Sequence, residues 1–374
     1  MKSLDKNFRH LSREDKLKQL VDYGWLDKTN YQTLLSNPVI DEEVANSLIE
    51  NVIGQGTLPV GLLPKIIVDE KEYVVPMMVE EPSVVAAASY GAKLVNQTGG
   101  FKTIKSERLM IGQIVFDDVK DTEDLTQRIQ KQENQIKRIA DEAYPSIIRR
   151  GGGYRGIDID AFPNEQLLSL KVFVDTKDAM GANMLNTILE AVTAYLKKEL
   201  TDQEILMSIL SNHATSSVVR VEGEIDINDL NRGDYSGEEV AKRMERASVL
   251  AQVDIHRAAT HNKGVMNGIH AVVLATGNDT RGAEASAHAY AARDGQYRGM
   301  ATWKYDKARG RIVGIIEVPM TLAIVGGGTK VLPIAKASLD LLNVESAREL
   351  GHVVAAVGLA QNFSACRALV SEGI

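Results

Sequence analysis

Three residues from distant segments have the chemical types that a carbonyl-reduction site requires. Lys263 lies among small and apolar residues, where an ammonium group needs an anionic partner. Asp279 follows in the next segment, and Glu81 lies far upstream. A lysine held by carboxylates can place positive charge against an oxygen that becomes negative during a reaction. The combination favours catalysis of carbonyl reduction.

Each of these residues, taken alone, also has a structural interpretation. Lysines are most often surface residues, so Lys263 alone indicates little. Glu81 alone reads as an exposed charge before a helix, and Asp279 alone reads as a turn residue. The alternative function is therefore a non-catalytic module that binds a coenzyme A thioester or a nucleotide, with Lys263 and Asp279 as a structural ion pair.

Two further segments bear on the binding of a phosphorylated ligand. The segment 151–156 matches G-x-G-x-x-G, but a helix is expected before it and a strand after it. This order is the reverse of the dinucleotide fingerprint, so a Rossmann fold is not expected. Asp178 precedes a predicted helix, whose N-terminus is either an anion site or simply capped by Asp178. Both interpretations remain open.

The bulk composition excludes several classes of protein. The chain has 374 residues, enough for two domains, and a formal net charge of -7, which argues against a general nucleic-acid surface. Cys366 is the single cysteine, which suits a reducing cytoplasm. No membrane-spanning apolar run, secretory signal or histidine spacing typical of a metal site is evident.

The expected order of elements predicts an α+β fold, in which a large helix-rich domain contains an inserted smaller domain. The insertion has the β-α-β-β-α-β order of a ferredoxin-like, split βαβ domain. We expect its elements at 109–119, 122–144, 157–162, 167–174, 179–200 and 216–222. The predicted domains are 1–107 and 222–374 for the large domain and 108–221 for the insertion.

Elsewhere we expect a helix over 41–53, a single helix over 237–259, and a hairpin formed by 301–305 and 311–318. Pro82 suits the first position of a helix over 83–95, because that position needs no backbone N–H.

Taken together, the motifs resemble the 3-hydroxy-3-methylglutaryl-coenzyme A (HMG-CoA) reductases of the soluble bacterial class, class II. The resemblance covers nearly the whole chain and follows the family's order. Its carriers are Glu50-Asn51-Val52-Ile53-Gly54, Glu80-Glu81-Pro82-Ser83, Asp178-Ala179-Met180-Gly181-Ala182-Asn183, His261-Asn262-Lys263-Gly264, Gly277-Asn278-Asp279 and Gly358-Leu359-Ala360-Gln361-Asn362.

The resemblance implies two successive hydride transfers from NADPH, which convert HMG-CoA to mevalonate and free coenzyme A through mevaldehyde, in the mevalonate pathway of isoprenoid biosynthesis. It also implies that the large domain binds HMG-CoA and the ferredoxin-like domain binds the nicotinamide cofactor. The expected protein is a cytoplasmic homodimer, or a larger assembly of such dimers, with the active site at the subunit interface. It needs no metal and binds neither nucleic acid nor membrane.

The resemblance assigns roles to individual residues. Lys263 would stabilise the developing oxyanion, Glu81 would donate a proton at the mevaldehyde stage, and Asp279 would tune the pair. The implied substrate-binding residues are Ser83, Arg257, Asn267 and Asn362. Arg257 suits the free carboxylate of the substrate because guanidinium binds carboxylates in a bidentate manner.

The cofactor-binding residues implied by the resemblance are Tyr144, Arg149, Arg150, Asp178, Met180, Gly181, Asn183 and Asn212. NAD-dependent relatives have an aspartate where this chain has Tyr144. Without that carboxylate a 2′-phosphate is not repelled, and Arg149 or Arg150 can pair with it. We therefore expect NADPH to be preferred and NADH to be a poorer donor.

The family's catalytic histidine lies on a C-terminal flap, in a Gly-His-Met segment beyond the point reached by Ile374. The flap domain is therefore expected to be absent from this chain. Because that histidine protonates the departing thiolate, its loss should impair the first reduction more than the reduction of free mevaldehyde.

Overall fold

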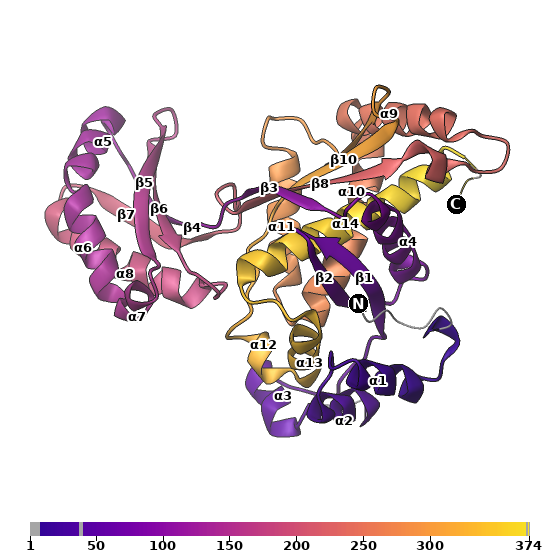
Figure 1. Cartoon of the computed structure of the whole chain (residues 1–374). Helices are drawn as coiled ribbons and strands as arrows, with labels where there is room; N and C mark the ends of the chain where they lie inside the picture. The colour runs from indigo at the N-terminus through magenta and orange to yellow at the C-terminus, as the bar shows by residue number, and fades with distance from the viewer. Residues whose placement is uncertain (1–7, 37–39, 372, 374) are drawn as a thin grey trace. The chain divides into compact units, whose positions relative to one another are not determined.

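The computed structural model describes residues 8–36, 40–371 and 373, and the chain divides into two compact units. Unit 1 contains Met1–Ser106, Val219–Val318 and Leu322–Ile374, and unit 2 contains Glu107–Val218 and Pro319–Thr321. Both units combine helices with antiparallel strands (Figure 1). The predicted α+β class is therefore confirmed.

Unit 1 has two antiparallel sheets. A hairpin joins β1 (Val60–Val68) to β2 (Lys71–Met78). The larger sheet has the order β3-β8-β10-β9, in which β3 is Lys102–Ser106, β8 is Val218–Asp226, β10 is Arg311–Pro319 and β9 is Ala301–Asp306. The hairpin predicted from 301–305 and 311–318 is confirmed, with Ile312 opposite Tyr305.

Three helices form the centre of unit 1: α4 (Val84–Gln97), α10 (Ile255–Ala275) and α14 (Ala347–Leu369). Helix α14 packs against both of the others, and Figure 1 shows it beside α10. Glycines permit this close packing. A Cβ on Gly91 of α4 would lie 2.2 Å from the carbonyl oxygen of Ala360, and one on Gly268 of α10 would lie 3.0 Å from that of Val357.

The other helices of unit 1 surround this centre. They are η1 (Phe8–His10), α1 (Arg13–Asp22), α2 (Lys28–Ser36), α3 (Glu42–Leu48), η2 (Ile227–Leu230), α9 (Gly237–Val253), α11 (Thr280–Ala291), α12 (Gly328–Val331) and α13 (Pro333–Leu342). The helix predicted over 41–53 is shorter than expected, because α3 ends at Leu48. The helix predicted over 237–259 is also wrong, because Asp254 starts α10 by accepting hydrogen bonds from the N–H groups of His256 and Arg257.

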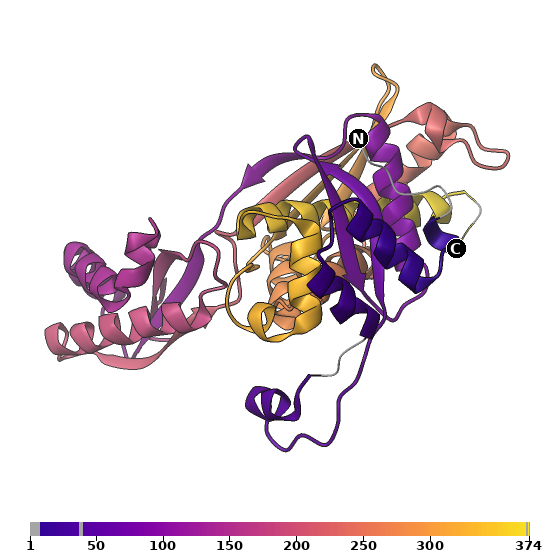
Figure 2. The same ribbon diagram turned by 60° about the horizontal axis from the view of Figure 1, so that its bottom comes forward.

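Unit 2 contains an antiparallel sheet of order β5-β6-β4-β7. The strands are β4 (Met110–Asp117), β5 (Gly153–Phe162), β6 (Leu167–Asp175) and β7 (Glu204–Ser211). The helices are α5 (Thr122–Lys131), α6 (Glu133–Ala143), α7 (Pro145–Arg149) and α8 (Ala182–Glu199). Figures 1 and 2 show α6 and α8 on the same side of the sheet. Their apolar side chains form one core with those of the strands.

Two predicted elements of this unit are wrong. The fourth strand of the sheet is β7, not 216–222, and Val218–Asp226 pairs in the other sheet. Edge strand β7 has exposed Leu206 and Met207, so its sequence lacks the alternation of a half-buried strand. The helix predicted over 122–144 breaks at Gln132, although the apolar spacing continues across the break from Ile129 to Ile136.

Candidate active site

Helix α10 places Lys263 on its exposed face. The neighbours His261, Asn262 and Val265 are buried on the opposite side, whereas 61% of the Lys263 side chain is exposed. The expectation that apolar sequence neighbours surround this amine is therefore wrong. Consecutive side chains of a helix point in different directions, so the side chains that flank Lys263 in the sequence do not surround its amine.

The predicted lysine–glutamate pair is present. The Nζ of Lys263 donates to Oε2 of Glu81 at 2.5 Å, and Nδ2 of Asn267 donates to Oε1 of the same carboxylate at 3.2 Å. Asn267 lies one helical turn after Lys263 and therefore shares its face. The two α10 side chains thus hold both oxygens of Glu81, which is itself partly exposed.

The segment after Glu81 has a strained backbone. Ser83 is the N-cap residue of α4, with a φ of 68° in the left-handed region, and its side chain makes no capping hydrogen bond. The prediction that Pro82 opens the helix is wrong, since α4 begins at Val84. A positive φ is costly for a residue other than glycine and is frequent at functional sites. The hydroxyl of Ser83 is accordingly not used to cap the helix.

Asp279 lies at the start of the next helix. It is the N-cap of α11, and its carboxylate accepts a hydrogen bond from the N–H of Gly282 at 3.0 Å. Within the described part of the chain, no hydrogen bond or ion pair joins Asp279 to Lys263. The structure therefore does not contain the Lys263–Asp279 ion pair of the alternative hypothesis.

Asn362 belongs to a buried polar cluster instead of an open surface. It is 1% exposed, and its Oδ1 accepts from Nε1 of Trp303 at 2.8 Å. Its amide nitrogen lies 3.3 Å from Nε2 of His261, which also lies 3.0 Å from the carbonyl oxygen of Ala301. These contacts connect α14, α10 and β9. They do not favour the expected contact between Asn362 and a substrate.

Arg257 lies near this cluster, in the first turn of α10, and its side chain is directed toward Cys366. Burial, reinforced by the positive charge of Arg257, lowers the pKa of His261 to about 4. Burial raises the pKa of the Cys366 thiol to about 11. His261 is therefore neutral and Cys366 is a thiol at neutral pH. No sequence pattern indicates this cluster, because its members come from three distant segments.

In unit 2, the loop after β6 has an unusual geometry. Gly181 is the N-cap of α8 with a φ of 89°, and a Cβ there would lie 2.3 Å from Cγ2 of Thr176. The N-cap position is thus taken by a glycine, which has no capping side chain, and Asp178 lies three residues before it. Uncapped N–H groups at a helix N-terminus can bind a phosphate. Asp178, Met180 and Asn183 surround this helix start.

The remaining predicted cofactor residues lie on other elements of unit 2. Tyr144 precedes α7 and packs partly against the core, whereas Arg149 and Arg150 are exposed at the end of α7. Neither arginine forms an ion pair with another described residue. Asn212 is exposed just after β7. Two exposed guanidinium groups and a helix start with glycine at the N-cap fit a phosphorylated dinucleotide.

The described ranges of the chain lack two kinds of feature. They contain no group of three or more histidine, cysteine, aspartate or glutamate residues arranged to hold a metal ion. None of their helices combines the length and apolar character needed to cross a membrane.

Comparison with known proteins shows extensive similarity. The sequence profile of hydroxymethylglutaryl-coenzyme A reductase matches residues 12–374. The 3-hydroxy-3-methylglutaryl-coenzyme A reductase of Archaeoglobus fulgidus is 41% identical over 377 residues, which cover 100% of this chain and 84% of that protein. A probable reductase of the same name from Borreliella burgdorferi is 33% identical over 99% of this chain and 84% of its own length.

Solved structures agree with these relatives. A 3-hydroxy-3-methylglutaryl-coenzyme A reductase of Streptococcus pneumoniae has a TM-score of 0.94 and 42% identity, covering 98% of this chain and 99% of its own. A structure with the same TM-score, identity and coverage is described as the class II enzyme of that organism bound to NADPH in open conformations.

Proposed function

Because the chain belongs to the hydroxymethylglutaryl-coenzyme A reductase family, we propose that it reduces HMG-CoA to mevalonate and free coenzyme A in the mevalonate pathway of isoprenoid biosynthesis. The contact that carries this proposal is the hydrogen-bonded pair of Lys263 and Glu81, which are 182 positions apart in the sequence. A long-range pair of exposed, opposite charges is suited to contacting a substrate. It adds little to stability, because water screens exposed ion pairs.

Two molecules of NADPH, bound in turn, would each supply one hydride. The first hydride would convert the thioester carbonyl to mevaldehyde with release of the coenzyme A thiolate, which takes up a proton, and the second would convert the aldehyde to the alcohol. Lys263 stabilises the negative charge that forms on the carbonyl oxygen in both reductions. Glu81 supplies the proton for the oxygen of the second reduction through its contact with Lys263. We further propose that Asp279 tunes this pair after its side chain leaves the N–H of Gly282.

Ser83, Arg257 and Asn267 are proposed to hold the HMG portion of the substrate. The hydroxyl of Ser83 makes no capping hydrogen bond to α4, and Ser83 is two residues after Glu81. Asn267 already donates to Glu81, so both residues lie beside the proposed reacting groups. Arg257 supplies the charge that the free carboxylate of the substrate requires. Asn362 is not included, because Trp303 and His261 occupy its polar atoms.

We propose that unit 2 is a ferredoxin-like domain that binds NADPH. Gly181 with Asp178, Met180 and Asn183 would contact the cofactor at the start of α8, where the N-cap residue is a glycine that leaves room for close approach. Tyr144 and Asn212 complete the site, and Arg149 or Arg150 would bind the 2′-phosphate. This arrangement supports a preference for NADPH over NADH.

The protein is also proposed to be a cytoplasmic homodimer with its active site at the subunit interface. Support for the dimer comes from large apolar side chains exposed at the end of α9 and the beginning of α10, close in sequence to Arg257. These residues are Val249, Leu250, Val253 and Ile255. Neighbouring exposed apolar residues are typical of interaction surfaces. Their coverage by a second copy would also restrict the water around Lys263.

The proposal is tested with Lys263→Ala and a matched control, Lys242→Ala. Both lysines are exposed on helices of unit 1 and pair with a glutamate, at 61% and 58% side-chain exposure. We expect Lys263→Ala to lower the rate of NADPH oxidation with mevaldehyde by at least ~100-fold, whereas Lys242→Ala has no effect. Thermal unfolding should be unchanged in both. Retention of activity by Lys263→Ala would overturn the proposed role, and an equal loss in both variants would show a non-specific charge effect.

A further inference from the structure

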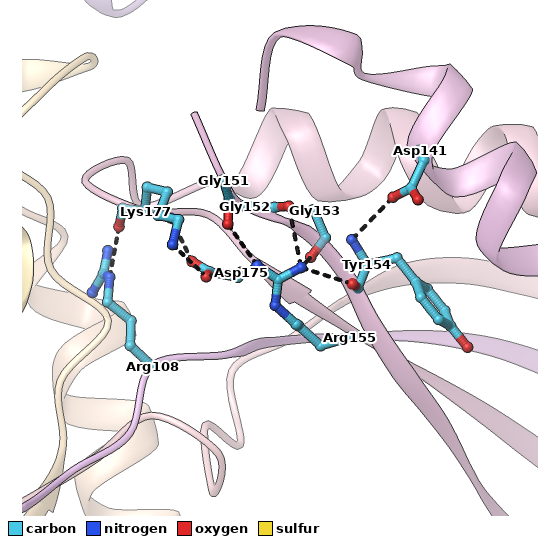
Figure 3. A network of polar contacts seen from close by, with 9 residues as sticks. All are labelled: Arg108, Asp141, Gly151, Gly152, Gly153, Tyr154, Arg155, Asp175 and Lys177. Carbon is cyan, nitrogen blue, oxygen red and sulfur yellow. Dashed lines mark hydrogen bonds and ion pairs between the residues drawn. The ribbon is translucent and has the colours of Figure 1, made fainter. Parts of the chain in front are cut away.

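The side chain of Arg155 folds back onto the turn that precedes it. Its guanidinium donates to the carbonyl oxygens of Gly151 at 2.7 Å, Gly152 at 3.1 Å and Tyr154 at 2.9 Å. It also donates to Oδ2 of Asp175 at 3.2 Å. Figure 3 shows these bonds converging on one side chain. Only arginine presents enough donors in one plane for this arrangement.

The turn held by Arg155 is the C-terminal end of α7. Gly152 donates its N–H to the carbonyl oxygen of Ile147 at 3.0 Å, and Gly151 donates to that of Ile148 at 2.9 Å. With Gly151 at a φ of 78°, these two bonds form a Schellman motif. Arg149 is the last residue of α7, and the residue after it starts the turn. The conformation of the turn therefore sets the directions of Arg149 and Arg150.

The same turn packs against the end of β6. A Cβ on Gly152 would lie 2.5 Å from the carbonyl oxygen of Asp175, and one on Gly153 would lie 2.2 Å from Cδ1 of Ile148. A side chain at position 152 would push the turn away from the strand, and one at position 153 would push it away from α7. The three consecutive glycines at 151–153 thus serve the geometry of this turn, which accounts for them without a Rossmann fold.

Asp175 connects the turn to the loop that starts α8. Its carboxylate binds Arg155, the Nζ of Lys177 at 2.9 Å and the N–H of Lys177 at 3.0 Å. Burial alone would raise the pKa of Asp175, but the hydrogen bonds from Lys177 and the charge of Arg155 outweigh it and hold the pKa below its ordinary value. The carboxylate is therefore charged. It links the two segments that carry the proposed cofactor residues.

We infer that Arg155 is a positioning residue for selectivity between the two nicotinamide cofactors: it holds Arg149 and Arg150 where they meet a 2′-phosphate. The inference rests on the proposed NADPH site. NADH lacks the 2′-phosphate, so disordering the turn removes an interaction that only NADPH makes. Loss of one charge-assisted hydrogen bond weakens binding by about tenfold or more.

The test measures the dissociation constants of NADPH and NADH by isothermal titration calorimetry with the full chain. We expect Arg155→Met to raise the dissociation constant of NADPH about tenfold while that of NADH changes less than about twofold. Arg155→Lys, which keeps the charge but not the planar set of donors, should give an intermediate value. Thermal unfolding shows whether Arg155→Met is folded. If it is not, Arg155→Lys is used for the test instead.

Two further variants separate the possible failures. Arg128, in α5 of the same unit, binds the carboxylate of Asp202 through two nitrogen atoms. Arg128→Gln should leave the dissociation constants of both NADPH and NADH unchanged. The double substitution of Arg149 and Arg150 by alanine tests the proposed phosphate site itself. The inference is wrong if the double variant loses selectivity for NADPH while the Arg155 variants keep it. It is also wrong if the Arg155 variants weaken the binding of NADPH and NADH equally. If the double variant keeps selectivity, the proposed 2′-phosphate site is wrong instead.

Discussion

Substitution of Asn362 by alanine separates a structural role from a substrate-binding role. In the folded protein its Oδ1 accepts from the indole N–H of Trp303, and both side chains are almost completely buried. Alanine leaves that N–H without a partner and without access to water. It also removes the amide that contacts the ring of His261.

The magnitude follows from these contacts. A buried donor without an acceptor costs about 1–3 kcal/mol, and the small cavity left by the missing amide adds about 1 kcal/mol. We therefore expect Asn362→Ala to lower the free energy of unfolding by roughly 2–4 kcal/mol. Because Lys263 and Glu81 keep their own contacts, the KM for HMG-CoA should change little.

The assay is urea denaturation followed by tryptophan fluorescence, to which Trp303 contributes directly, together with steady-state kinetics. Asn267→Ala is the matched amide control and should behave in the opposite way. Its side chain binds Glu81 at the exposed face of α10, so activity should fall while stability is nearly unchanged. A raised KM with unaltered stability in Asn362→Ala would refute the reasoning and restore the role in substrate binding.

Two further predictions concern stability. The folded protein lowers the pKa of His261 from 6.5 to about 4, so its unfolded form binds the proton more tightly. The contribution of neutral His261 to the free energy of unfolding should be fully present above pH 6.5. It should decrease by up to about 3 kcal/mol as the pH falls toward 4. Denaturation across this range, compared with His261→Gln, checks it, and an identical pH dependence in the variant would exclude His261 as the source. Ser83→Gly should relieve the positive φ and stabilise the protein by about 1 kcal/mol, while loss of the hydroxyl raises the KM for HMG-CoA. A destabilised variant would contradict the assignment of strain.

The sequence was most informative where short-range pattern and family motif agree. Lys263 and Asn267, both named as site residues, are one helical turn apart, and both donate to Glu81. The hairpin of β9 and β10 was also predicted, because a polar turn separates two apolar runs. In both cases the interaction depends on residues whose spacing is fixed by local backbone geometry.

Other features depend on contacts that local pattern does not encode. Nothing in the spacing of His261, Trp303 and Asn362 indicates that they meet, because the packing of α14 decides it. Strand β7 was missed since an exposed edge strand need not alternate polar and apolar residues. The glycine motif was correctly excluded as a Rossmann fingerprint. A pattern of residue types does not indicate that backbone carbonyl groups of this segment accept hydrogen bonds from Arg155.

The glycine contacts between α4, α14 and α10 have a consequence for evolution. One of the proposed reacting groups precedes α4 and the other is carried by α10, so the thickness of the helix between them sets their separation. A single added methyl group at Gly91 would meet the carbonyl oxygen of Ala360 and force the helices apart. Variants that lose turnover can thus arise at positions that no reactant touches, and compensating changes should arise on the facing side of α14.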